Sequence, residues 1–90
     1  MNLKKIQIKG IDGNTTMVDF DYKGLAKYIF SKTKDIGELE IARELYKEGS
    51  IELDKENAMA LKAYIGEAFG AVVQESLYPE LDKIINQEIK

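Results

Sequence analysis

The spacing of apolar residues predicts a helix over residues 35–48 that stops at a glycine. Apolar side chains recur there every three or four positions, as they do along one face of a helix: Ile36, Leu39, Ala42, Leu45 and Tyr46. Asp35 is placed to accept a backbone N–H bond in the first turn, and Glu38 can reach back to it, as in a capping box. Gly49 follows, where a residue that readily adopts positive φ ends a helix.

Beyond Gly49 the pattern predicts a short strand and then a long helix. Residues 50–53 alternate polar and apolar, so Ile51 and Leu53 share one face, as in a half-buried strand. Asp54 is then expected to cap a helix. The apolar stripe of that helix contains Ala58, Leu61, Ile65, Phe69 and Val72.

Two residues are candidates for the end of the long helix. Pro79 lacks a backbone N–H and disfavours helical conformation at Tyr78, so we expect it to interrupt the helix and to begin a terminal one. The alternative is that Gly70 ends or kinks the long helix earlier. The terminal helix would bury a stripe made of Leu81, Ile84, Ile85 and Ile89.

The long helix carries a row of small residues, Ala63, Gly66 and Gly70, between Met59 and Val73. Each interior glycine costs roughly 0.5–1 kcal/mol relative to alanine, so the row indicates that another backbone approaches closely. Either a helix of the same chain lies there, or a second copy does in a homodimer. The candidate interface combines this face with the terminal stripe: Met59, Ala63, Gly66, Gly70, Val73, Leu81, Ile85 and Ile89.

The N-terminal third predicts a β-hairpin, because residues 5–9 and 16–20 both alternate apolar and polar. A two-residue loop at 12–13 would turn the apolar residues of the second strand toward the lysines. A three-residue loop at 12–14, with Asn14 in the left-handed conformation, gives one apolar face. That loop pairs Ile8 with Val18 and Ile6 with Phe20. The exposed face would then contain Lys5, Gln7, Lys9, Thr15, Met17 and Asp19.

A first helix is expected from Tyr22 to about Thr33, capped by Asp21. Its inward residues would be Leu25, Ala26 and Ile29. Tyr28 and Phe30 lie beside this stripe, so at least one of them extends it or reaches the surface. An exposed tyrosine there would suit an interface anchor, although tyrosines also cover the edges of cores.

Composition excludes several kinds of chemistry. The 90 residues, 44% of them hydrophobic, suffice for one domain (1–90) with its own core. There is no cysteine and no histidine, which removes thiolate chemistry and the commonest general base and metal ligand. Asp19 and Asp21 resemble the start of a calcium loop, but Phe30 stands where the bidentate Glu belongs. We therefore expect no catalytic residue, no cofactor and no metal ion.

No apolar run approaches the roughly 18 residues of a membrane span, and the N-terminus lacks the apolar core of a signal peptide. We therefore expect a cytoplasmic protein with no membrane partner.

Charge is divided unevenly along the chain, whose formal net charge is −3. Residues 1–34 hold seven lysines and three aspartates, a balance of +4, and residues 35–90 hold six basic and thirteen acidic groups, a balance of −7. The halves could attract each other, within one fold or between subunits, or the first could face nucleic acid. The candidate basic surface is Lys5, Lys9, Lys23 and Lys27. The single arginine, Arg43, lies in the acidic half, which disfavours specific DNA recognition.

Residues 42–54, with sequence Ala-Arg-Glu-Leu-Tyr-Lys-Glu-Gly-Ser-Ile-Glu-Leu-Asp, precede an amphipathic helix, and Val18-Asp19-Phe20 ends the hairpin. In these features the chain, over residues 4–65, resembles small uncharacterised proteins of phages and mobile elements in gut bacteria. The resemblance implies an accessory or interaction role and carries over no functional residues.

Together these patterns predict an α+β domain of order ββααβαα, in which a hairpin and a short third strand pack one face on about four helices. The function expected is a non-enzymatic protein-interaction or self-associating module, with a homodimer possible. The alternative is weak nucleic-acid binding through the lysine-rich residues 4–34.

Overall fold

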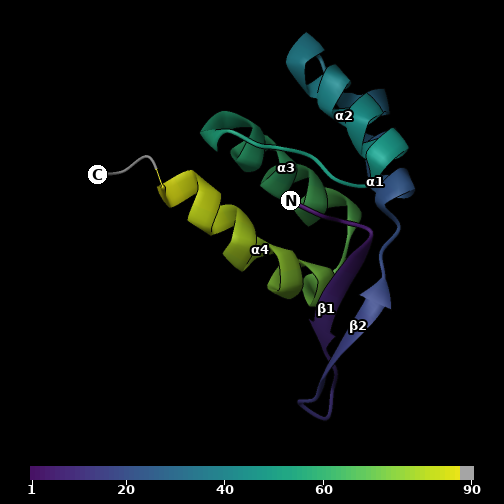
Figure 1. Ribbon diagram of the computed structural model, residues 1–90, viewed down its shortest axis with the longest axis vertical. Coiled ribbons are helices and arrows are strands. Elements are labelled where there is room, and N and C mark those ends of the chain that lie inside the picture. Colours follow the sequence, from purple (N-terminus) through teal and green to yellow (C-terminus); the bar gives the residue numbers. More distant parts are fainter. Residues whose placement is uncertain (88–90) are drawn as a thin grey trace.

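The computed structural model describes residues 1–87, which form two strands and four helices (Figure 1). The strands are β1 (Lys5–Lys9) and β2 (Thr15–Asp19). The helices are α1 (Tyr22–Lys32), α2 (Ile36–Glu48), α3 (Lys55–Ala68) and α4 (Ala71–Asn86). The α+β class predicted from the sequence is therefore confirmed.

The helices pack in two successive pairs, α1 with α2 and α3 with α4, and the pairs meet where α1 contacts α3. Strand β1 lies against α4, so the hairpin extends the α3/α4 side of the molecule (Figure 1). Helix α2 thus lies at one edge and the hairpin turn at the other.

One hydrophobic core contains buried residues of β1 and the four helices, and Val18 of β2 packs against it. Its buried members are Leu3, Ile6, Phe20, Leu25, Ala26, Ile29, Ala42, Leu45, Ile51, Ala58, Leu61, Ile65, Leu77 and Leu81. The inward residues predicted for the first three helices include Leu25, Leu45 and Leu61, and these are confirmed. Leu3, which is fully buried, precedes every regular element and has no periodic pattern that would have predicted it.

The hairpin has the predicted loop length and faces but a different register. Lys9 pairs with Thr15 and Ile6 with Val18, so the predicted Ile6–Phe20 pair is wrong by two positions. The loop is residues 11–13, and Gly13, not Asn14, adopts positive φ (86°). A shift of two residues leaves every side chain on its expected face. The exposed face is therefore as predicted.

Residues 50–53 do not form the predicted third strand. Ser50 makes a single antiparallel bridge with Asn2, and the segment is otherwise irregular. Backbone hydrogen bonds join Leu3 N to Gly49 O (2.8 Å) and Ile51 N to Met1 O (2.9 Å). The partner segment is too short for a ladder, but Ile51 is still buried, as its alternation indicated.

Helix α2 begins at Asp35 as expected, but Glu38 does not complete a capping box. Asp35 Oδ1 accepts from Gly37 N at 2.7 Å, and the Asp35 N–H donates to the Thr33 hydroxyl. Glu38 instead accepts from the Thr33 hydroxyl (2.8 Å) and from Tyr64 of α3 (2.7 Å). Glu38 therefore bonds to Thr33 and to α3 in place of the predicted hydrogen bond with the Asp35 N–H.

The expectation that Pro79 interrupts the last helices is wrong. Helix α4 runs through Pro79, and the break falls at Phe69 and Gly70, the alternative that the sequence left open. Leu77 and Leu81, on either side of Pro79, are both buried, so core packing offsets the missing N–H. Phe69 leaves the helix and packs its ring 4.9 Å from that of Phe20.

Three residues assigned to apolar stripes reach the surface. Ile36 is 79% exposed, Val72 50% and Tyr46 43%. Ile36 and Tyr46 belong to α2, which packs mainly on α1, so only one narrow face of it is buried. Val72 belongs to α4, beyond the break at Gly70. A stripe wide enough for a central helix is too wide for an edge helix.

Gly49 yields the first prediction. It ends α2 with φ 70°, and an added Cβ would lie 2.5 Å from Lys4 Cγ. Gly49→Ala should therefore destabilise the protein by more than the roughly 1 kcal/mol of left-handed strain alone. Gly13→Ala is the matched control, because its φ is also positive but nothing lies within 4 Å. Urea unfolding of both variants measures how much more free energy of unfolding Gly49→Ala loses than Gly13→Ala. Adding Lys4→Ala to the Gly49→Ala variant should restore this additional free energy. Equal losses would contradict the proposed contact.

Candidate functional site

A largely apolar hollow on the described surface is a groove between α1 and α2, with a volume of about 290 Å³. It is lined by Ala26, Lys27 and Phe30 from α1 and by Ala42, Arg43 and Tyr46 from α2. We call it the α1/α2 groove.

The floor of the α1/α2 groove includes one buried alanine from each helix, Ala26 of α1 and Ala42 of α2. Ala26 and Ala42 are both buried, at 2% and 1% exposure. Their side chains are too short to fill the space between the outer flanks of the two helices. A hollow therefore remains where larger residues would have closed the seam.

Two aromatic side chains form the walls of the groove. Phe30 is 51% exposed and Tyr46 is 43% exposed, so each has one side against the protein and the other in solvent. Large aromatic side chains are the residues most often found as anchors at protein interfaces. Phe30 is one of the two residues beside the α1 stripe, with Tyr28, of which at least one was expected to extend the stripe or reach the surface.

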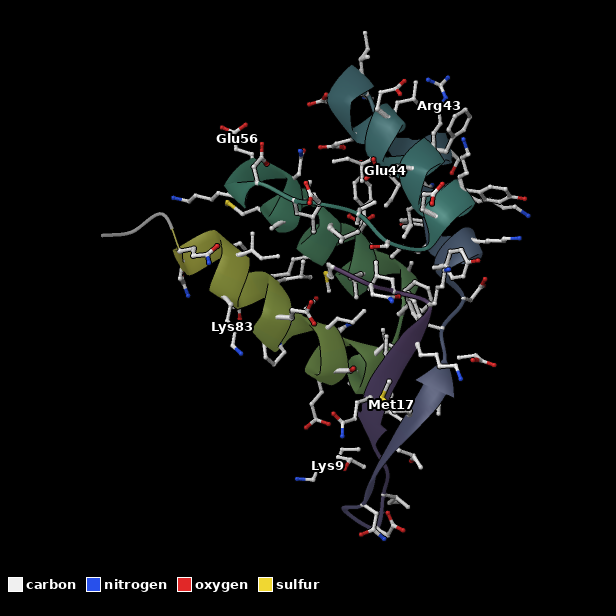
Figure 2. The ribbon with its side chains drawn as sticks, in the orientation of Figure 1. Lys9, Met17, Arg43, Glu44, Glu56 and Lys83 are labelled. Atoms are coloured by element: carbon white, nitrogen blue, oxygen red, sulfur yellow. The ribbon has the colours of Figure 1, made fainter. Side chains whose placement is uncertain are left out.

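Three cations surround the groove and lie over its aromatic rings. The ammonium groups of Lys23 and Lys27 are 5.4 and 5.9 Å from the Tyr46 ring centroid. The Arg43 guanidinium is 5.7 Å from the Phe30 centroid. These are cation–π distances. Figure 2 shows Arg43 on the outer side of α2, away from α3 and α4.

One carboxylate within residues 1–87 pairs with one of these three cations. Glu40 accepts from Arg43 one turn along the helix, in an exposed pair. Within residues 1–87, neither Lys23 nor Lys27 forms an ion pair. The groove is therefore electropositive, although the chain as a whole is acidic.

The opposite flank of α2 is acidic. A shallow surface there is lined by Glu40, Ile41, Arg43, Glu44, Lys47, Glu48 and Glu52. Glu40, Glu44 and Glu48 recur every four positions along α2, and all three are exposed. Helix α2 thus separates a basic aromatic surface from an acidic one.

The four residues of the candidate basic surface lie on two different elements. Lys5 and Lys9 are on the exposed face of β1, where Lys5 lies 3.9 Å from Asp19. Lys23 and Lys27 are on α1 beside Tyr46. In Figure 2 the labelled Lys9 is on the hairpin, at the far end of the molecule from Arg43.

The candidate interface residues are divided among several environments. Leu81 is fully buried in the core, and Val73 is half-buried against it. Met59, Ala63 and Ile85 line a shallow hollow between α3 and α4, which the Lys62–Asp82 ion pair (2.7 Å) borders. Ile89 lies outside the described residues.

The two glycines of the small-residue row have different surroundings. An added Cβ at Gly66 would lie 2.7 Å from the Tyr78 hydroxyl of α4, so the close neighbour is within the same chain. At Gly70 nothing lies within 4 Å, and this residue is the N-cap of α4 with extended backbone angles.

On the other side of α1 from the groove, two tyrosines join α1 and α2 to α3. Tyr28 donates to Glu67 and Tyr64 donates to Glu38, each at 2.7 Å, and the two rings meet edge to face at 6.1 Å. The hydrogen bond to Glu67 is the main cause of a raised pKa at Tyr28. Burial, followed by the hydrogen bond to Glu38, raises the pKa of Tyr64 above 10.0.

No family model matches the chain, and no curated protein or solved structure matches it at a significant level. In the described part of the chain, no three or more acidic residues converge as metal ligands would. No helix within residues 1–87 is long and apolar enough to cross a membrane.

Sequence reasoning does not identify the groove, because it treats each helix by itself. Apolar periodicity places Tyr46 in one buried stripe and Phe30 beside another. The one signal that points to the groove is an alanine at the centre of each stripe, Ala26 and Ala42, flanked by an aromatic residue. Only the pairing of α1 with α2 brings these features together.

Gly66 yields a second prediction. Gly66→Ala alone should be nearly neutral, because a gain in helix propensity of about 1 kcal/mol is opposed by contact with the Tyr78 hydroxyl. In a Tyr78→Phe background, which removes that oxygen, the same substitution should stabilise the protein by about 0.5–1 kcal/mol. Thermal unfolding of the four proteins in this cycle measures the coupling. An additive cycle would show that Tyr78 does not restrict this position.

Tyr64 yields a third prediction. Tyr64→Phe should cost about 1 kcal/mol of stability at neutral pH, through loss of the hydrogen bond to Glu38. Because the folded-state pKa of Tyr64 is raised above its usual 10.0, this contribution is present below pH 10.0 and is lost as pH rises through the folded pKa. The difference in free energy of unfolding between wild type and Tyr64→Phe should therefore become smaller in strongly alkaline solution. Denaturant unfolding against pH tests this, with Tyr22→Phe as the control. A constant gap would contradict it.

Proposed function

We propose that this chain is a non-enzymatic protein-interaction module whose docking surface is the α1/α2 groove. The observation that carries the proposal is the pair of half-exposed aromatic walls, Phe30 and Tyr46, over a buried alanine floor. A hydrophobic centre with aromatic anchors and a polar rim is the usual anatomy of an interface.

The size and shape of the groove also support docking. Its volume of about 290 Å³ is at the lower end of the roughly 300–1,000 Å³ typical of small-molecule pockets. It is open along the seam of two helices, and no catalytic constellation lines it. It therefore suits one anchoring side chain of a partner better than an enclosed substrate.

The cations beside the rings supply the polar rim. Arg43 and Lys27 line the groove itself, and Lys23 reaches Tyr46 from one turn away on α1. Arginine and tyrosine are both enriched among the residues that contribute most to binding. Because the groove is formed by rigid helices, the anchors are held before the partner arrives, which reduces the entropy lost on binding.

A fourth prediction tests the docking surface with random peptides in place of a natural partner. Selection of displayed random peptides on the purified chain should enrich peptides that bind wild type but not the Phe30→Ser/Tyr46→Ser variant. Two anchors of this type contribute on the order of 2 kcal/mol or more each at interfaces, so the loss should be complete at screening concentrations.

Met17→Ser is the matched control, because Met17 is 60% exposed on the hairpin and distant from α2 (Figure 2). It should retain every enriched peptide. Circular dichroism establishes that each variant is folded. If no enriched peptide depends on Phe30 and Tyr46, the α1/α2 groove is not a docking surface and the proposal is wrong.

A further inference from the structure

From the charges around the α1/α2 groove, we infer that its partner is a protein segment that presents one large apolar side chain flanked by carboxylates. The inference rests on the proposed function and adds the chemistry of the partner. It follows from three features of the groove: its floor, its rim and the charge of the neighbouring surface.

The floor selects for an apolar side chain. Ala26 and Ala42 offer only methyl groups, and the walls are the exposed sides of Phe30 and Tyr46. A polar side chain placed there would lose water without gaining a hydrogen bond from the floor, whereas an apolar one gains from burial. The volume of about 290 Å³ accommodates a single large side chain.

The rim selects for carboxylates. Lys23 and Lys27 approach the groove from the α1 side and Arg43 from the α2 side, so cations lie on both flanks of the hollow. Of these, only Arg43 has a carboxylate partner within residues 1–87, the exposed Glu40. An anchoring side chain seated on the alanines would place its neighbouring residues beside these cations.

The aromatic rings restrict where the cations lie. Each of the three cations lies within 6 Å of a ring centroid, so it is positioned at the rim by the same side chain that forms the wall. A partner's carboxylate therefore meets a charge that is already close to the apolar pocket. This arrangement couples recognition of charge to recognition of an apolar side chain.

The surface next to the groove limits the length of an acidic partner. On the other flank of α2 four carboxylates outnumber the two cations Arg43 and Lys47, and they are Glu40, Glu44, Glu48 and Glu52. A long polyanion such as single-stranded nucleic acid would extend past the three cations and meet these carboxylates. A short acidic segment around one anchor does not extend that far. Charge complementarity thus favours a peptide over nucleic acid.

The test is fluorescence anisotropy at low salt with a fluorescein-labelled short peptide that has one central phenylalanine between pairs of aspartates. Three further probes are compared with it. In the second probe serine replaces the phenylalanine, in the third lysines replace the aspartates, and the fourth is a thymidine oligonucleotide. Wild type should bind the first probe at least about tenfold more tightly than any of the others. Binding should weaken at high salt, where exposed charges are screened.

Substitutions at the rim and the wall should have separate effects. Phe30→Ser should weaken binding of the acidic probe at least about tenfold at any salt concentration. In the Lys23→Glu/Lys27→Glu variant, the groove should no longer prefer the aspartate probe and should bind the lysine probe more tightly. Lys9→Glu, an exposed charge reversal on the hairpin, should leave all affinities unchanged. The charge reversals are at exposed positions, so they test the inference even if Phe30→Ser unfolds.

The outcomes separate the inference from the proposed function. If random peptides bind the groove but the acidic probe does not exceed the neutral or basic ones, the inference is wrong and the docking function stands. Tighter binding of the oligonucleotide, lost in Lys23→Glu/Lys27→Glu, overturns the inference in favour of nucleic acid. Self-association in light scattering that Phe30→Ser removes overturns it in favour of a second copy. If no probe and no random peptide depends on Phe30, both are wrong.

Discussion

The N-terminal segment is held against the end of α2 by a short set of backbone hydrogen bonds, and the arrangement of the whole molecule depends on them. The Met1 ammonium donates to Ile51 O at 2.6 Å, and Leu3 N donates to Gly49 O. Leu3 is thereby fixed in the centre of the core, fully buried. The same segment continues into β1, which packs on α4. One extended stretch of chain thus connects the α1/α2 pair to the α3/α4 pair and the hairpin.

Much of the fold could be predicted from local pattern, because most of its determinants are local. Asp21, Asp35 and Asp54 all cap helices through their side chains, and Gly49 ends α2 in the left-handed conformation, as the sequence indicated. The predictions that were wrong concern residues whose contacts are with segments distant in the sequence. Glu38 bonds to Tyr64 instead of the cap, and the segment after Gly49 lacks a long enough neighbour to become a strand.

The α1/α2 groove shows the same limit for function. No motif marks it, because it consists of ordinary residues whose meaning changes when two helices pair. Ala26 and Ala42 are good core residues by themselves, and Tyr46 fits an apolar stripe. Side by side, the alanines leave a hollow and the aromatic residues border it. Two cations lie at its rim, Lys27 from the basic half of the sequence and Arg43 from the acidic half. The net charges of the two halves give no sign of this pairing.

The opposite charges on the two flanks of α2 would affect how fast the proposed acidic partner arrives. Cations surround the groove on one side, and on the other side the glutamates Glu40, Glu44, Glu48 and Glu52 outnumber Arg43 and Lys47, so charge is unequal across the helix axis. An approaching acidic segment is drawn toward one flank and turned away from the other before any contact forms. For the acidic partner inferred above, this field would orient the encounter, so that a larger fraction of diffusive collisions would begin with the groove facing the partner.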